Sequence, residues 1–337
     1  MRIEKYLIGL LVLCSCVKPA RHPAPSAEVS FTLSDHVTKL TGAPDGHESA
    51  VSHWAVFVFD TGSGWCRYGC SEDGTALSLS LTQGRRYECL AVVNYPRSGS
   101  RALNPPEIHG ASQLRSCIAQ LEENAPGYFL MTGERLLVPV ARYAQLEILV
   151  ERLVSRLDVE GIRVDFSSWP DWASESLLLR HIYVTNAYKT APYGDIGLQQ
   201  SALRTAWYNT LGWHGGGDAS AALDMLLSER DIDVLIDGNH PYTTRHSFYF
   251  YPNPLAEDDR QTLEWTPRHT RLVIEAEVAG TVYYYPADIP SSLRRNQRCS
   301  AGEVVIRGPG SSSPEGTTLA RNAFSVEWDG GEKITLD

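Results

Sequence analysis

The sequence lacks the short motifs that identify many enzymes and metalloproteins. It has no nucleophile elbow, and the glycines at 215–217 are not followed by the Lys-Ser/Thr pair of a phosphate-binding loop. Its ten histidines include no His-Glu-x-x-His motif and no other spacing typical of paired metal ligands. We therefore expect a protein that is not an enzyme, with no catalytic residues, no metal site and no cofactor.

Basic residues are also scarce relative to acidic ones. The 337-residue chain contains 30 Lys and Arg against 40 Asp and Glu, a formal net charge of −10. Such a balance disfavours nucleic acid and anionic lipid as partners, because binding either requires clustered cations. The aspartates of residues 231–237 lack the spacing of a calcium loop, and Ile232, Val234 and Ile236 between them predict a strand with one buried face.

The apolar run at the N-terminus, residues 6–13, is too short to span a bilayer and follows a basic start, which is typical of an export signal. Leu13-Cys14-Ser15-Cys16 resembles a bacterial lipobox, so residues 1–16 are expected to be a lipoprotein signal region with Cys16 as the lipidated residue. Cys14 is the second choice, because Leu13 is large for the position before the cut. A plain secretory signal is the alternative to both.

Two folded domains are expected after a short tether. Residues 17–27 contain three prolines and predict a solvated linker between the lipid and the fold. The length of the chain exceeds that of a usual single core, and we place the domains at residues 28–147 and 148–337.

Short strands account for most of the sequence pattern. Residues 28–33 alternate as a strand, and the nearly continuous apolar residues of 51–60 predict a central strand covered on both faces. Residues 112–122 have helical spacing and predict one short amphipathic helix. Many strands, frequent turn signals and few helices together favour β-sandwiches.

The segment 270–314 is the most informative part of the chain. Leu272, Ile274, Ala276 and Val278 alternate with Arg271, Val273, Glu275 and Glu277, the pattern of a strand with one buried and one solvent-facing side. Gly280 turns the chain into a second strand that is expected to stop at Pro286. Residues 303–307 predict a third strand, which is broken by the Gly-Pro-Gly that follows. This pattern indicates architecture without catalytic function.

Several short motifs occur in a distinctive order. They are Thr-Arg-Leu-Val-Ile at 270–274, Tyr-Tyr-Pro at 284–286, Arg-Arg-Asn at 294–296 and Gly-Pro-Gly-Ser at 308–311. In the first half, a Val-Phe-Asp strand ends at Asp60 and another strand ends at Asn94. This series resembles the fimbrillin family, the subunits of the donor-strand pili of Bacteroidales.

The resemblance implies a mainly β fold of two tandem transthyretin-like β-sandwich domains with a few short helices. It also implies a structural subunit of a surface-exposed cell-surface pilus, or fimbrium, that is processed as a lipoprotein. Such a subunit is held in the cell outer membrane through lipid on Cys16 and assembles with other fimbrial subunits by donor-strand exchange. In the family an Arg-specific protease removes the first strand.

The segment between the first two strands, residues 34–50, contains Lys39 but no Arg. This departure favours an anchor or another minor subunit that keeps its first strand, or a species with a different protease. At the other end of the chain, residues 322–337 alternate as strands. They are expected either to close their own sheet or to fill the groove of another subunit.

Five cysteines follow the signal region, an odd number, so at least one thiol is unpaired. Cys66 and Cys70 lie in one glycine-containing segment, which makes them a candidate disulfide across a turn. Trp207, Tyr208 and Trp213 lie in a segment without clear periodicity, as do two earlier tryptophans at 169 and 172. These aromatic residues predict either core packing or a ligand platform. A platform supports the alternative function of a surface lipoprotein adhesin that binds carbohydrate or a host ligand.

Overall fold

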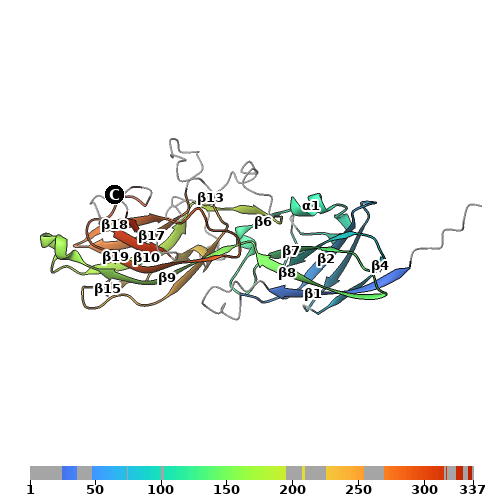
Figure 1. Cartoon of the computed structure of the whole chain (residues 1–337). Coiled ribbons are helices and arrows are strands. Elements are labelled where there is room, and N and C mark those ends of the chain that lie inside the picture. Colours follow the sequence, from blue (N-terminus) through green and yellow to red (C-terminus); the bar gives the residue numbers. More distant parts are fainter. Residues whose placement is uncertain are drawn as a thin grey trace, which may run out of the picture.

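The computed structural model describes residues 25–35, 48–73, 75–99, 102–194, 207–208, 225–253, 269–314, 316, 324–328 and 333–335. These form an elongated, mainly β molecule with two lobes and a few short helices (Figure 1). The first lobe contains β1 (Ser26–Asp35), β2 (Trp54–Asp60), β3 (Cys66–Ser71), β4 (Leu77–Thr82), β5 (Tyr87–Val93), β7 (Met131–Leu137) and β8 (Tyr143–Arg152). The second contains β9 (Ser155–Val164), β10 (Leu177–Thr185), β14 (Ser228–Glu229), β15 (Val234–Ile236), β16 (His246–Phe250), β17 (Arg271–Val278), β18 (Thr281–Asp288), β19 (Arg298–Ile306), β20 (Phe324–Trp328) and β21 (Lys333–Thr335).

The strands of the first lobe follow the order β3-β2-β5-β7-β8-β1-β4. They fold into two layers that are joined where β7 pairs with β8 over only two residue pairs. One layer contributes Phe31 and Ile148 to the core between the layers, and the other contributes Trp54 and Val56. Every residue of β2 is buried, which confirms the expectation of a central strand covered on both faces.

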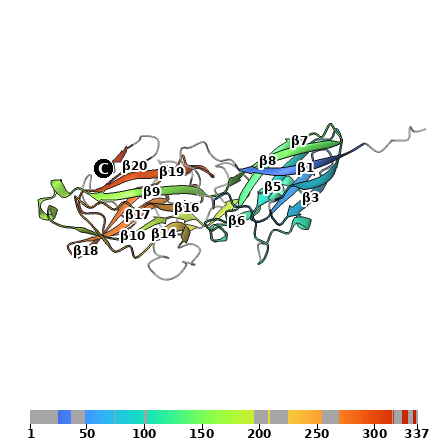
Figure 2. The same cartoon turned by 90° about the horizontal axis from the view of Figure 1, so that it is seen from below.

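The second lobe contains two five-stranded sheets (Figure 2). One follows the order β14-β10-β17-β18, with β15 also paired to β10, and the other follows β16-β9-β19-β20-β21. The predicted strand around residues 231–237 is shorter than expected, because β15 covers only Val234–Ile236 and of these three only Ile236 is buried. The inner faces of the sheets pack on one another through Leu157, Leu179 and Val304, among others.

Several short elements complete the chain. They are α1 (Ala111–Arg115), β6 (Ile118–Gln120), β12 (Thr190–Pro192), β11 (Ala187–Tyr188), β13 (Trp207–Tyr208) and the 3-10 turns η1 (Pro105–Glu107), η2 (Leu121–Glu123), η3 (Phe166–Ser168) and η4 (Pro170–Trp172). Strand β12 leaves the second lobe and pairs with β6, which precedes β7 of the first lobe. One apolar cluster therefore runs through both lobes, from Phe57 to Ile306. The expected boundary at 147/148 falls inside β8, and the chain changes sheets between Arg152 and Ser155.

The helix expected over residues 112–122 is wrong in its extent. Helix α1 ends at Arg115, and residues 118–120 form β6 instead. Leu114 does face the core, as the helical spacing predicted. The backbone of residues 118–120 pairs with β12, a strand some seventy residues later that no local pattern could supply.

The hairpin predicted around Gly280 is present, but its second strand is longer than expected. Ala279 and Gly280 both have positive φ angles of 48° and 77°, which the tight turn between β17 and β18 requires. Strand β18 continues through Pro286 to Asp288. Proline is tolerated there because β18 is an edge strand, whose other side forms only a single bridge, between Tyr284 and Ser311, in the described part of the chain.

Candidate functional site

Strand β1 occupies an interior position in the first lobe. It pairs in parallel with β8 over eight residue pairs and antiparallel with β4 over six. Ala27, Val29 and Phe31 alternate toward the core, and each is 0% exposed. The strand is thus inserted between two neighbours and supplies one row of the core side chains of its layer.

The end of the connection between β1 and β2 contacts the second lobe. Glu48 forms an ion pair with Arg156 of β9 and accepts a hydrogen bond of 2.6 Å from the hydroxyl of Tyr249 of β16. The backbone carbonyl of Glu48 accepts a further bond of 3.0 Å from Nε of Arg152. The same Arg152 donates to Oδ1 of Asn296, at 2.6 Å. These contacts connect four separate parts of the chain at the waist of the molecule.

Asp158 is the centre of this junction. Its fully buried carboxylate accepts hydrogen bonds from Arg156 and Arg245, both at 2.7 Å, from Arg298, and from the hydroxyl of Ser247 at 2.6 Å. Burial alone would raise the pKa of Asp158. The bonds from Ser247 and Arg156 outweigh burial, so the pKa lies below its usual value. The carboxylate is therefore charged and fully hydrogen-bonded.

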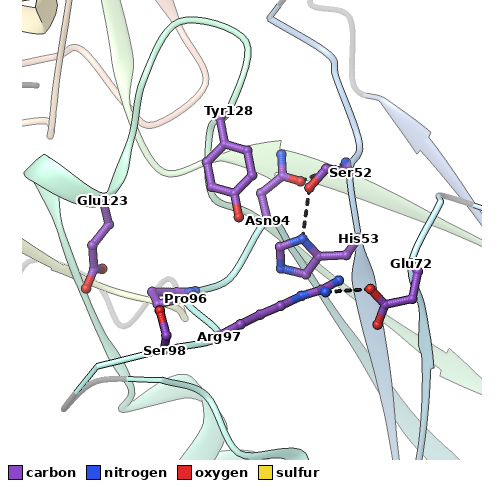
Figure 3. Close-up of a pocket in the computed structure, with 9 residues that line it drawn as sticks. All are labelled: Ser52, His53, Glu72, Asn94, Pro96, Arg97, Ser98, Glu123 and Tyr128. Atoms are coloured by element: carbon purple, nitrogen blue, oxygen red, sulfur yellow. Dashed lines mark hydrogen bonds and ion pairs between the residues drawn. The ribbon is translucent and has the colours of Figure 1, made fainter.

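A polar pocket of about 480 Å³ opens near the same waist. It is lined by Ser52, His53, Glu72, Asn94, Pro96, Arg97, Ser98, Glu123 and Tyr128. Figure 3 shows Glu72 and Glu123 on opposite sides of the opening, with Tyr128 above and Arg97 crossing below toward Glu72. Arg97 and Glu72 form an ion pair. The pocket therefore combines one aromatic ring with several oriented hydrogen-bonding groups.

The floor of the pocket is rigid. Nε2 of His53 lies 2.8 Å from the carbonyl oxygen of Tyr95, so this nitrogen carries the proton and Nδ1 accepts from the Ser52 hydroxyl at 2.9 Å. Burial lowers the pKa of His53, which keeps the ring neutral. Asn94, at the end of β5 with φ of 53°, accepts from the amide of Ser52 and donates to the carbonyls of Ala50 and Phe129.

The candidate disulfide between Cys66 and Cys70 is wrong. Both residues lie in β3, four positions apart in an extended strand, and both are free thiols. Four residues of extended chain span roughly 13 Å, which is about twice the separation that a disulfide permits. The segment had been predicted to turn, whereas Cys66–Ser71 pairs with β2 along its whole length.

The candidate aromatic platform is only partly within the described residues. Trp207 and Tyr208 form β13, which pairs with β11, and Trp213 lies outside the described part of the chain. The earlier tryptophans serve packing. Trp172 lies edge-on to Phe166 with ring centroids 5.2 Å apart.

Cys16 also lies outside the described residues. Within the described part, no helix is both long enough and apolar enough to cross a membrane. Among the same residues, no group of three or more His, Cys, Asp or Glu side chains is arranged to hold a metal ion.

The sequence pattern did not indicate a role for Glu48 or Asp158, nor that the pocket residues come together. One signal was available for Asp158, because it is a charged residue between two apolar residues, Leu157 and Val159, which both face the core. Glu48 had no local signal, since it lies in a polar connection among glycines and a proline.

No family model matches the chain, and no curated protein matches it in sequence. Solved structures do match. A candidate cell adhesion protein of Bacteroides eggerthii aligns over 92% of this chain and 97% of its own, with a TM-score of 0.64 and 14% identity. A fimbrilin of Porphyromonas gingivalis aligns over 89% and 95%, with a TM-score of 0.55 and 13% identity. This chain has the fimbrilin fold.

A second candidate cell adhesion protein, of Parabacteroides distasonis, gives the same result over 90% of this chain and 97% of its own, with a TM-score of 0.59 and 13% identity. The fimbrilin fold thus extends over both lobes. The resemblance expected from the short motifs is confirmed at the level of the fold.

Asn94 and Asn296 are structural: each closes a turn with a positive φ angle and hydrogen-bonds to another segment.

Proposed function

We propose that this protein is a structural subunit of a cell-surface fimbrium and has no catalytic activity. Its two lobes act as tandem transthyretin-like sandwiches, and it assembles with other fimbrial subunits by donor-strand exchange. The fold and the interior position of β1 support this proposal. Lipidation at Cys16 would hold the subunit in the outer membrane, with residues 17–27 as the tether.

The position of β1 carries the proposal. If β1 were absent, β4 and β8 would each lose a hydrogen-bonded neighbour, and a row of core positions between them would be empty. Unpaired strand edges of this kind bind an added strand through main-chain hydrogen bonds, and pockets for alternate side chains select its sequence. Phe31 and Val29 now fill those pockets.

We propose further that this subunit keeps β1 and is an anchor or minor subunit, so that its own groove stays filled and it takes part in donor-strand exchange only by supplying a strand to a neighbour. The connection to β2 contains no Arg for an Arg-specific protease. Within its last part, Glu48 is held by Arg156 and Tyr249, which restrains the end of the connection. N-terminal sequencing of protein from its native surface is expected to begin at Cys16 or within the tether. A first residue between Ser34 and Val51 would contradict retention of β1.

Electron microscopy of intact cells tests the fimbrial role. Gold-labelled antibodies against the protein are expected to mark pili or their bases. Deletion of its coding sequence is expected to change the number, length or attachment of pili. Unlabelled pili together with unchanged pili in the deletion strain would contradict the proposal.

The alternative function is a surface lipoprotein adhesin, and the polar pocket favours it. The pocket has a tyrosine ring, two carboxylates, an arginine and serine hydroxyls. Neutral sugars bind where an aromatic face lies beside oriented hydrogen-bond donors and acceptors. The lining of this pocket has two carboxylates and one arginine, a balance that disfavours anionic ligands. A glycan array with the wild type and Arg97→Ala tests this function. Glycan signals that persist in the variant would exclude this pocket as the binding site. If neither protein gives a signal, a role as an adhesin for the glycans tested would be excluded.

A further inference from the structure

Four segments meet at the end of the first lobe that is farthest from the second lobe. They are residues 25–28, 60–67, 82–86 and 138–143, which we call the N-terminal pole (right-hand end in Figure 1). Strand register brings them together, because Ser26 pairs with Thr82 and Glu28 with Tyr143. In the other layer, the turn at 60–65 joins β2 to β3 at the same end, where Asp60 pairs with Tyr87.

Large apolar side chains of the pole are exposed. Val140 is 82% exposed, Tyr143 66%, and Val138 and Trp65 48% each. They come from both layers of the lobe, Trp65 from the turn between β2 and β3 and the other three from the connection of β7 to β8 and the start of β8. A cluster of this kind on a protein surface usually marks a site of contact with a protein or a membrane.

The charge of the pole is opposite to that of the protein. The pole contains four arginines and two acidic residues, a net charge of +2, whereas the chain as a whole carries −10. One of the acids, Asp60, is buried and paired with Arg85 at 2.7 Å. The guanidinium group of Arg142 lies 5.4 Å from the ring centroid of Tyr143, and that of Arg67 lies 4.5 Å from Trp65.

We propose that the N-terminal pole docks on the surface of a phospholipid bilayer with anionic headgroups. Tyrosine and tryptophan rings favour the interfacial region of a bilayer, exposed valines enter its apolar edge, and arginines attract anionic headgroups. The position of the pole next to the tether supports a bilayer as its binding partner. That the pole faces the membrane rests on the proposed lipidation of Cys16. Cys16 precedes Pro25 by nine residues, so an extended tether would keep the pole within about 30 Å of the lipid.

Docking would fix the direction of the whole molecule. Because the pole is at one end of the long axis, contact with the bilayer would direct the second lobe outward (Figure 1). A lipid on a flexible tether alone would leave the subunit free to tilt. An upright subunit presents its second lobe to the next subunit, as an anchor must.

Vesicle co-sedimentation tests the proposal without the lipid anchor. The full chain carrying Cys16→Ala is mixed with vesicles of phosphatidylethanolamine and phosphatidylglycerol. Adding Val140→Glu and Tyr143→Glu is expected to lower the partition coefficient by about ten-fold or more, because two charges replace apolar contacts. The matched control adds Met225→Glu and Leu235→Glu, which are exposed positions of the second lobe. It is expected to bind like the background.

Every variant carries the same first 24 residues, so differences among variants report the pole. Equal binding by the pole and control variants would overturn the proposal. Ultracentrifugation without vesicles tests whether the pole instead binds a second copy of the protein. A dimer that forms with Cys16→Ala alone and is lost in the pole variant would show this, and would also overturn the proposal of bilayer docking. Failure of lipidation is observed separately, as release of the wild-type protein from cell membranes.

Discussion

Glu48 and Arg156 form an ion pair between the two lobes, with only 9% and 11% of their side chains exposed. Glu48 lies near the end of the connection between β1 and β2, and Arg156 lies on β9, which begins the second lobe. Asp158, two residues farther along β9, lies on the same outer face and accepts hydrogen bonds from Ser247 of β16 and Arg298 of β19. Charged groups thus couple the lobes where the chain between them is shortest.

Replacing the central carboxylate is expected to destabilise the protein strongly. Asp158→Asn would leave the guanidinium groups around it without their buried counter-charge, and such a change costs about 3–5 kcal/mol of unfolding free energy. Urea denaturation measures this loss. Asp171→Asn, at an exposed position of η4, is the matched control and is expected to change stability by less than about 0.5 kcal/mol. A loss below about 1 kcal/mol in Asp158→Asn would show that the junction contributes little to stability.

The same carboxylate predicts acid sensitivity. Because the pKa of Asp158 is depressed in the folded protein, its contribution to stability is present above the unfolded value of 3.8 and is lost as the pH falls below it. Denaturation series from about pH 5 down to about pH 2.5 are expected to show a smaller decline for Asp158→Asn than for the wild type. If the stability of the two proteins falls equally with pH, groups other than Asp158 cause the acid sensitivity.

Lipid attachment is expected to depend on one cysteine. Cys16→Ala should abolish incorporation of a labelled fatty acid and the stable membrane attachment that the lipid provides, because the thioether bond requires that thiol. Cys14→Ala is the matched control and should retain both. Label that persists in Cys16→Ala and disappears in Cys14→Ala would move the modification to Cys14.

The C-terminal hairpin is expected to belong to its own sheet. Strand β20 pairs with β19, and Val326 is buried in the apolar cluster of the second lobe. Deletion of residues 322–337 should therefore remove or strongly lower the calorimetric transition of that lobe. A truncated protein with an unchanged melting temperature that no longer enters fibres would instead make this segment a donor strand for a neighbour.

The sequence by itself determined the strands and their buried faces. The continuous apolar run of β2 predicted burial on both faces, and the alternation of β17 predicted the buried positions Leu272, Ile274, Ala276 and Val278, because strand periodicity depends only on neighbouring residues. Val273 and Glu275 on the other face of β17 are buried as well, which the alternation did not indicate. Local chemistry also predicted the turn at Gly280. The same kind of reasoning failed where pairing with a distant strand decided the outcome, as at Pro286 and at residues 118–120.

Tertiary structure alone decided which charges meet. The excess of acidic residues in the sequence disfavoured anionic lipid as a binding partner. The strand order nevertheless brings Arg67, Arg85, Arg86 and Arg142 from separate turns to one pole. It likewise brings Glu48 to Arg156 across 108 positions. Such contacts depend on the register between strands far apart in the chain, and the side chains involved lie on polar faces and loops whose local pattern does not indicate their partners.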